Sequence, residues 1–299
     1  MRFISGKSKQ PPKILTDQTA KRQINKAFVN EDGNKCTRYR EVYAKLKAVS
    51  LGKRTLQADE GGKCFYCESK PENGAKLEVE HYRPKGAVDK KDTAGVENKG
   101  YFWLGNEWSN LLLACSDCNG KSAKGNRFPI AGNRAPAINP VKGDRLYRKK
   151  CIATNSPLKD ELPLLINPMI DDPSQFFTFD EFGNINAIPD ALDRGKTTME
   201  ILLLNDKQKR GVLFKSRQNV LNSFIDSMNV LNAYWVKYGR SNLLDNLLNA
   251  ECRKIKKAQN PEEEFSQFGK AINDNFENWI ANRYTDPFKH QLITIYNSI

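Results

Sequence analysis

The chain has 299 residues and a mass of 34.0 kDa, with 48 Lys and Arg residues against 35 Asp and Glu residues. A mean hydropathy of -0.66 and the lack of an apolar run of about 18 residues exclude a membrane-spanning protein. The only histidines are His81 and His290, which excludes a site built from three imidazoles. The start of the chain turns polar and basic at once, so we expect no secretory signal and a cytoplasmic protein.

Positive charge is concentrated in the first half of the chain. Residues 1–150 hold 31 Lys and Arg against 16 Asp and Glu, a net charge of +15, whereas residues 151–299 hold 17 against 19, a net charge of −2. This asymmetry favours a polyanion-binding half joined to a scaffolding or partner-binding half. Excess lysine that only keeps the surface soluble is the alternative, and charge alone does not identify nucleic acid as the partner.

In chain order, the pattern predicts an α+β protein that is mainly helical. Residues 1–60 are expected to form a basic N-terminal arm and a helix over about 38–56, where apolar residues recur at helical spacing. Residues 61–135 contain two short strands, at 77–81 and 111–114, and each strand is close to a Cys-x-x-Cys pair. This middle segment is therefore predicted to be a small module inserted in a helical chain.

Residues 136–299 are predicted to form a mainly helical scaffold or partner-binding region. The region begins with an irregular stretch in which prolines recur, and residues 176–185 form a hairpin with Gly183 near its turn. Apolar residues at helical spacing then predict four helices, over 197–204, 207–238, 243–258 and 261–282. We interpret the apolar stripes of these helices as core rather than as functional surface.

Two Cys-x-x-Cys pairs form the strongest chemical pattern of the sequence. The two residues between the cysteines of a pair let both sulfurs reach one metal, and four thiolates bind Zn²⁺ tetrahedrally. We therefore predict one structural Zn²⁺ site, with two buried or redox-active pairs as the alternative. The predicted ligands are Cys64, Cys67, Cys115 and Cys118. The remaining cysteines are isolated and are interpreted as ordinary thiols: Cys36, Cys151 and Cys252.

Between these pairs lie residues that suit phosphodiester hydrolysis. His81 follows Glu80 at the end of a predicted strand, and imidazole accepts a proton from water near neutral pH. A divalent cation must then neutralise charge on the phosphate. Mg²⁺ binds through one or two protein oxygens and keeps waters in its shell, so Glu80 and Asn119 are suitable ligands. Outside this setting, His81 would be interpreted as an ordinary histidine.

Two stretches resemble the HNH, or ββα-metal, nuclease module. They are VEHYRP at 79–84 and NLLLACSDCNGKS at 110–122. A longer match, which adds residues 101–104, 107–110 and 124–129, resembles more narrowly the HNH subunit of Septu-type bacterial anti-phage systems, also found beside some retrons. The resemblance implies a metal-dependent endonuclease that hydrolyses phosphodiester bonds in nucleic acid, most often DNA, as the effector of a defence complex.

The resemblance also implies a role for each matching residue. His81 is the base that activates water, and Glu80 and Asn119 bind the catalytic Mg²⁺ or Mn²⁺. Asn110 braces the loop and orients the histidine. Glu80 stands where the family usually has Asp or His, and relative to Asp it carries one more methylene group. Five flanking basic residues are candidates for phosphate binding, each with solvated surface charge as the alternative: Arg83, Lys85, Lys121, Lys124 and Arg127.

Partners follow from the same resemblance. It implies an ABC/SMC-like ATPase subunit and, in retron-type systems, a reverse transcriptase with its RNA–DNA product. We expect the helical region or the basic arm to dock on the ATPase. The alternatives are an RNA nuclease that cuts tRNA in a retron-type system, and a zinc-containing nucleic-acid-binding or assembly subunit without catalysis. Nothing in residues 64–129 distinguishes deoxyribose from ribose.

Overall fold

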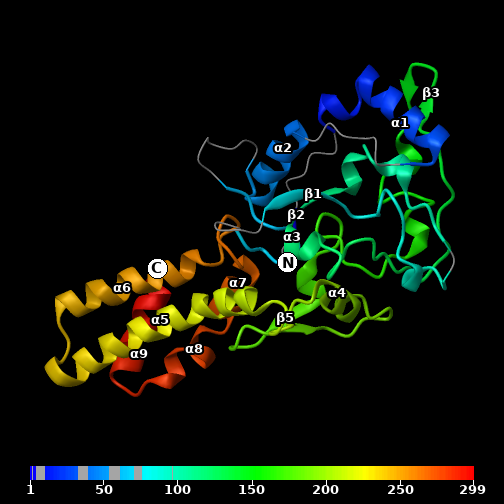
Figure 1. Ribbon diagram of the computed structural model, residues 1–299. Helices are drawn as coiled ribbons and strands as arrows, with labels where there is room; N and C mark the ends of the chain where they lie inside the picture. The colour runs from blue at the N-terminus through cyan, green and yellow to red at the C-terminus, as the bar shows by residue number, and fades with distance from the viewer. Residues whose placement is uncertain (2, 5–10, 33–39, 54–60, 71–75, 96) are drawn as a thin grey trace. The chain divides into compact units, whose positions relative to one another are not determined.

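The computed structural model describes residues 1, 3–4, 11–32, 40–53, 61–70, 76–95 and 97–299. The chain divides into two compact units (Figure 1). The first unit comprises Met1–Phe176 and Ala187–Leu203, and the second comprises Phe177–Asn186 and Leu204–Ile299. Cys36 and parts of the predicted N-terminal arm and helix lie outside the described residues.

An antiparallel hairpin lies at the centre of the first unit. Strand β1 (Leu77–His81) pairs with β2 (Leu111–Cys115), so that Leu77 is opposite Cys115 and His81 is opposite Leu111. Every residue of the apolar strand β2 is buried. Helix α2 (Arg40–Ser50) packs on this hairpin through buried apolar residues that include Leu46 (Figure 1). The candidate site is built on this hairpin.

A short helix, α3 (Ser116–Asn119), follows β2 without a loop. It ends after a single turn because Gly120 leaves the helical conformation while its N–H donates to the Ser116 carbonyl at 2.7 Å. A Cβ atom at Gly120 would lie only 2.8 Å from that carbonyl oxygen, so the close approach requires glycine. The hairpin and this short helix give the ββα order that the sequence predicts.

The rest of the first unit is built from short elements. Helix α1 (Gln18–Asn30), which the sequence analysis does not predict, is capped by the Asp17 side chain, which accepts from Ala20 N at 2.8 Å. It packs on the small hairpin of β3 (Val141–Lys142) and β4 (Arg145–Leu146). Among the described residues of this unit, the other helices are α4 (Arg194–Leu202) and 3-10 turns at Lys13–Leu15, Lys90–Asp92, Phe102–Leu104, Trp108–Asn110, Lys149–Cys151, Lys159–Glu161 and Pro173–Gln175.

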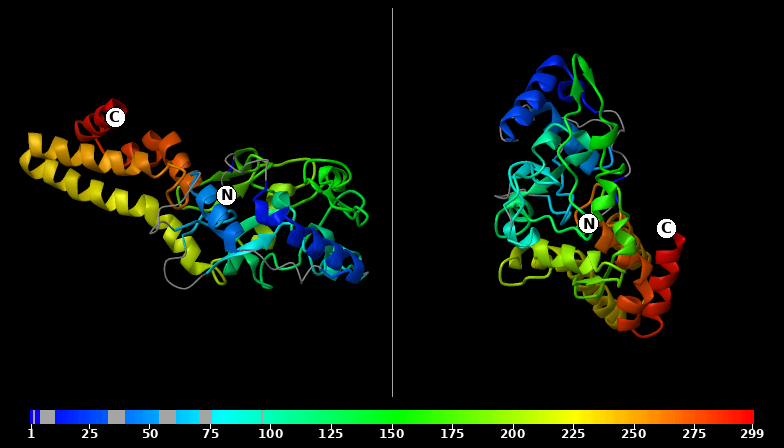
Figure 2. Two further views of the ribbon diagram at one scale, coloured as in Figure 1. Left: turned by 90° about the horizontal axis from the view of Figure 1, so that it is seen from above. Right: turned by 90° about the vertical axis from the view of Figure 1, so that its right-hand side faces the viewer.

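The second unit is mainly helical. It begins with the predicted hairpin, β5 (Phe177–Phe179) and β6 (Ile185–Ala187), and Gly183 in the turn has a φ of 75°. Helices α5 (Gly211–Tyr238) and α6 (Asn242–Lys257) run side by side (Figure 2). The remaining helices are α7 (Ser266–Asp274), α8 (Phe276–Trp279), a 3-10 turn at Ala281–Arg283, and α9 (Phe288–Ser298).

These elements confirm the predicted α+β class with mainly helical content, but one predicted helix is wrong. The stretch 261–282 is not continuous, because Asn275 leaves the helical conformation at φ −117° and ψ 25° between α7 and α8. Its side-chain Nδ2 donates to the Ala271 carbonyl at 2.9 Å, which stabilises the break. None of the described helices combines the length and the apolar composition that crossing a bilayer requires.

Candidate functional site

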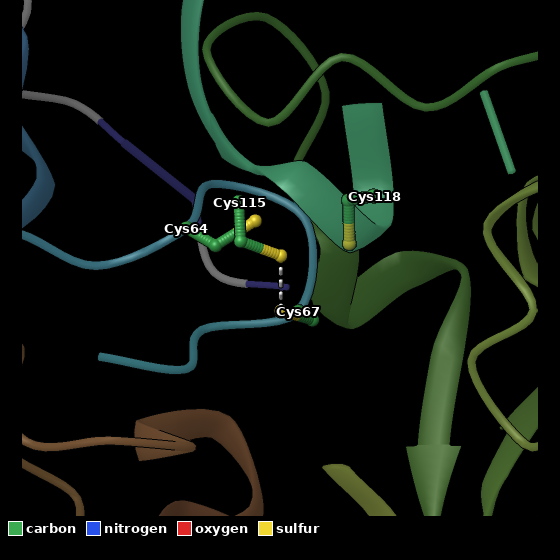
Figure 3. Close-up of side chains that lie close together, drawn as sticks. All are labelled: Cys64, Cys67, Cys115 and Cys118. Carbon is green, nitrogen blue, oxygen red and sulfur yellow. Dashed lines mark hydrogen bonds between the residues drawn. The ribbon is translucent and has the colours of Figure 1, made fainter. Parts of the chain in front are cut away.

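Four cysteine side chains converge at one end of the central hairpin (Figure 3). Cys64 and Cys67 come from the loop before β1, Cys115 ends β2, and Cys118 lies in α3. All four are buried, and their Sγ atoms lie within 4.8 Å of one another. The Sγ atoms of Cys67 and Cys115 are 3.7 Å apart. The two predicted pairs therefore form one cluster.

Backbone hydrogen bonds hold the first Cys-x-x-Cys pair in place. Cys64 N donates to the Ser69 carbonyl at 3.0 Å, and Glu68 N donates to the Cys64 carbonyl at 3.0 Å. Glu68 adopts a left-handed conformation at φ 66°, which lets the chain turn directly after the pair. Phe65 N donates to the Leu113 carbonyl of β2 at 2.8 Å, so the turn is fixed to the central hairpin.

The chemistry of this cluster fits a zinc ion. Burial raises the pKa of the Cys64 thiol, and hydrogen bonding to Cys115 is the main cause of the raised pKa of Cys118. Four thiolates in one buried place therefore need a cation to be stable, and Zn²⁺ takes four thiolates in tetrahedral geometry. Within the described parts of the chain, no other group of three or more His, Cys, Asp or Glu side chains is placed to hold a metal.

His81 lies at the last position of β1 and is buried, with an exposed fraction of 8%. Its ring Nε2 lies 3.1 Å from the Gly105 carbonyl oxygen. Because a carbonyl only accepts, Nε2 carries the proton in the neutral ring, and Nδ1 is the proton-accepting nitrogen. Burial, assisted by the charges of Lys85 and Lys124, lowers the pKa of His81 to about 3. The imidazole is therefore neutral at neutral pH, as a general base must be.

Asn110 links two backbone segments near His81. One is Arg83, two residues after His81, and the other is the turn that ends at Gly105, whose carbonyl binds the imidazole. Its Oδ1 accepts from Arg83 N at 2.8 Å, and its Nδ2 donates to the carbonyls of Arg83 at 3.0 Å and Leu104 at 3.4 Å. Leu104 directly precedes Gly105, whose carbonyl accepts from the imidazole. These contacts support the bracing role that the resemblance implies for Asn110.

Side chains alternate along a strand, so Glu78 and Glu80 of β1 share one face while His81 lies on the other. Asn119 donates from Nδ2 to Glu78 Oε2 at 2.7 Å, and Glu80 forms an ion pair with Lys124. The structure thus brings Asn119 to Glu78 rather than to Glu80. The sequence analysis missed Glu78, although its spacing of two residues from Glu80 would have indicated the shared face.

Lys124 is a fully buried cation at the centre of this arrangement. Its Nζ binds the Glu80 carboxylate and also donates to the His81 carbonyl at 3.0 Å. Burial raises the pKa of Glu80, and the Lys124 ammonium opposes that rise. Since the ammonium is buried and already binds these two acceptors, Lys124 does not fit the predicted role of a surface residue that binds phosphate.

Arg83 is also buried, and its guanidinium does not fit surface phosphate binding either. Its Nε donates to Glu161 Oε2 at 2.7 Å, and its Nη2 donates to the Leu158 carbonyl at 2.7 Å. The other three predicted phosphate contacts remain accessible. Lys121 is exposed, Lys85 is half-buried, and Arg127 is half-buried beside Asp92, with Nε 2.9 Å from Oδ2.

Glu161 is a structural residue that the sequence analysis missed. Besides Arg83, its carboxylate accepts from Tyr101 OH at 2.6 Å and from Ala135 N at 2.9 Å. The side chain is fully buried, so these hydrogen bonds satisfy a charge that would otherwise be costly. Glu161 lies far along the chain from its partners, and no local pattern marks it.

The chain is similar in sequence to two curated proteins from Bacillus mycoides strain KBAB4. It is 33% identical to "Septu protein PtuB" over 158 residues, which are 52% of this chain and 47% of that relative. It is 34% identical to "Septu protein PtuA" over 164 residues, which are 54% of this chain and 20% of that relative. The chain thus spans about half the length of the first relative and about a fifth of the second. No family model matches the chain. The predicted resemblance to Septu proteins is confirmed at the level of sequence similarity.

Proposed function

We propose that the chain is a metal-dependent HNH endonuclease that hydrolyses phosphodiester bonds in nucleic acid, DNA first, as the effector of an anti-phage defence complex. The observation that carries this proposal is the environment of His81. Its Nε2 binds the Gly105 carbonyl, and Asn110 holds the backbone of Arg83 and of Leu104, next to Gly105, in place. The four-cysteine cluster and the similarity to Septu proteins support it further.

In the proposed reaction, His81 Nδ1 takes a proton from a water molecule, and the resulting hydroxide attacks the phosphorus atom. The negative phosphodiester raises the proton affinity of the neutral imidazole as it approaches, which counteracts the pKa-lowering effect of burial. The bond to the departing 3′-oxygen breaks, so the product carries a 5′-phosphate. Hydrogen bonding to Gly105 keeps the ring in the productive tautomer throughout.

Glu80 and Asn119 are the proposed ligands of Mg²⁺ or Mn²⁺. The bound ion would neutralise charge on the phosphate and the departing oxygen. Glu78 shares a hydrogen bond with Asn119 and adds a second carboxylate on the same face. Lys124 already neutralises Glu80, so either glutamate could be the metal ligand. Comparing Glu78→Gln with Glu80→Gln identifies which of the two carboxylates binds the catalytic metal. The more important ligand is the one whose variant loses more activity and recovers more in Mn²⁺ or in higher Mg²⁺.

Replacing the base tests the catalytic proposal. His81→Ala is expected to lower cleavage of plasmid DNA or RNA about 10²–10⁴-fold, because the general base is lost. Zinc content and circular dichroism should not change. His290→Ala is the matched control, since that histidine is exposed in α9. If His81→Ala cuts as well as the wild type, His81 is not the base. If the wild type itself does not cut, the chain is a nucleic-acid-binding or assembly subunit without catalysis. The same assay decides between DNA and RNA, including tRNA.

The proposed partner is an ABC/SMC-like ATPase that triggers the nuclease. Co-expression with the neighbouring gene followed by a sizing column tests this: a larger complex, with nuclease activity above that of the isolated chain, is expected. If the chain elutes as a monomer with and without the neighbouring gene product, and is fully active alone, the proposal of an ATPase partner is wrong. A reverse transcriptase partner stays a prediction from the resemblance. Cysteines that bind a metal rather than form disulfides are typical of a reducing compartment, so we propose that the protein is cytoplasmic.

A further inference from the structure

A cavity of about 390 Å³ lies in the first unit. Tyr82 and Arg83 form part of its wall, whereas His81 does not line it. The rest of the wall is mostly apolar and includes Ile170 and Leu192. This volume is near the lower end of the range of about 300–1,000 Å³ found for small-molecule sites. The cavity thus has room for one small ligand with an apolar body.

The charges around the cavity leave one cation available. Arg194 binds Asp171 through both guanidinium nitrogens, at 3.0 and 2.7 Å, and Arg83 is paired with Glu161. Lys159 is exposed, and no acidic side chain of the described residues pairs with its ammonium. The lining therefore offers a single uncompensated positive charge, which suits a ligand with an anionic group.

The cavity also contains a buried hydrogen-bond donor. Asn167 has an exposed fraction of 1% and lines the cavity, and its Oδ1 accepts from Met169 N at 3.1 Å. Its Nδ2 has no hydrogen-bond acceptor among the described residues. A buried donor without an acceptor costs free energy, so an acceptor on a bound ligand would stabilise both. The ligand chemistry is therefore an apolar body, an acceptor at its edge and an anionic group.

We propose that this cavity binds one nucleotide of the strand that is cut, next to the phosphodiester at His81. A nucleobase provides apolar faces with acceptors along its edge, and its phosphate provides the anion. Arg83 is two residues after His81, so their Cα atoms are at most about 7 Å apart, and the cavity wall at Arg83 lies close to His81. A base paired inside a duplex cannot enter a cavity, so the bound nucleotide is unstacked. The inference rests on the proposed function for the identity of the strand.

Binding of nucleotides to the zinc-loaded full chain tests the inference. Nucleoside 5′-monophosphates, ribose and deoxyribose, are titrated by calorimetry, with nucleosides and inorganic phosphate as comparison ligands. At least one nucleotide is expected to bind about tenfold more tightly than its nucleoside and than phosphate, because both the base and the phosphate contribute. No binding of any nucleotide at millimolar concentration, or equal binding of phosphate alone, overturns the inference.

Two variants locate the binding. Ile170→Trp fills the cavity and Lys159→Glu reverses its free charge; both side chains are exposed, so the fold should be kept. Each is expected to weaken nucleotide binding about tenfold. Val212→Trp and Lys215→Glu, exposed positions of the second unit, are the matched controls and should bind as the wild type does. Equal binding by all four variants would place the nucleotide elsewhere and overturn the assignment.

Titration with a trinucleotide distinguishes binding of a nucleic-acid strand from binding of a free nucleotide. Titrated into the His81→Ala chain without divalent metal, it should bind more tightly than the best mononucleotide, because neighbouring phosphates add contacts. Weaker or equal binding would overturn the strand assignment. The proposed function fails on a different readout, namely cleavage by His81→Ala. The two failures are therefore distinguishable.

Discussion

At the scale of single residues, the candidate site depends on polar groups that are buried but satisfied. Arg83 and Glu161 form a fully buried ion pair, and Lys124 and Glu80 form another beside the proposed base. Breaking a buried pair typically costs about 3–5 kcal/mol, because an uncompensated charge remains. These cations therefore stabilise the first unit from inside, and we expect any phosphate contacts to come from basic side chains nearer the surface.

Asn110 provides a residue-scale prediction. Asn110→Ala removes three hydrogen bonds to buried backbone groups of Arg83 and Leu104, at a cost of about 1–3 kcal/mol for each buried group left unsatisfied. We also expect kcat to fall while KM stays unchanged, because the imidazole loses its fixed acceptor at Gly105. Urea unfolding and initial rates measure the two effects.

Conservative and remote variants complete that experiment. Asn110→Asp keeps the acceptor for Arg83 N but loses both donated bonds, so its kcat should lie between those of the wild type and Asn110→Ala. Asn126→Ala, at an exposed position, should change neither stability nor rate. A change in KM alone would show that Asn110 does not position the base.

At the scale of elements, one strand connects the two parts of the site. β2 carries Cys115 at its end, pairs with the strand that carries His81, and continues into α3 with Cys118. A metal held by the four cysteines would therefore fix the start of α3 against the hairpin. Binding of the structural metal and folding of the module should be one event, as in other small zinc sites.

Loss of one zinc ligand tests this coupling. Cys118→Ser is expected to reduce zinc well below one ion per chain and to unfold the hairpin, because such sites supply folding energy. Elemental analysis and amide hydrogen exchange of the β1–β2 pairing measure the two outcomes. Cys151→Ser is the control, since Cys151 is also buried but lies outside the cluster. Full hairpin protection in zinc-free Cys118→Ser would contradict the coupling.

The elements also show what the sequence could and could not predict. The strands at 77–81 and 111–114 were predictable because alternation and β-branched or leucine-rich runs are local patterns, and the cysteine cluster followed from pair spacing. Helix α1 was missed although Ala20, Ile24 and Ala27 recur at helical spacing on its buried side, because it follows a basic, proline-containing segment that was interpreted as an extended arm. The partners of Arg83 and Lys124 were not predictable, because they depend on contacts between distant segments.

At the scale of the whole molecule, charge and chemistry belong to the same part of the chain. Residues 1–150 carry 31 Lys and Arg against 16 Asp and Glu, and they contain the cysteine cluster and His81. The helices α5, α6, α7 and α9 of the second unit carry none of the proposed chemistry. Nucleic acid should therefore bind to the first unit, mainly through its accessible basic side chains.

Salt dependence of binding tests which side chains these are. For duplex DNA, each phosphate neutralised by a Lys or Arg contributes about 0.9 to the slope of log K against log salt. Lys85→Ala and Lys121→Ala, made in the His81→Ala chain to prevent cleavage, should each make the slope shallower by about that amount. Arg127→Ala should have a smaller effect, because its guanidinium is already paired with Asp92. Lys215→Ala, at an exposed position of the second unit, is the control and should leave the slope unchanged. Equal slopes for Lys85→Ala, Lys121→Ala and the control would show that nucleic acid does not contact the surface around the candidate site.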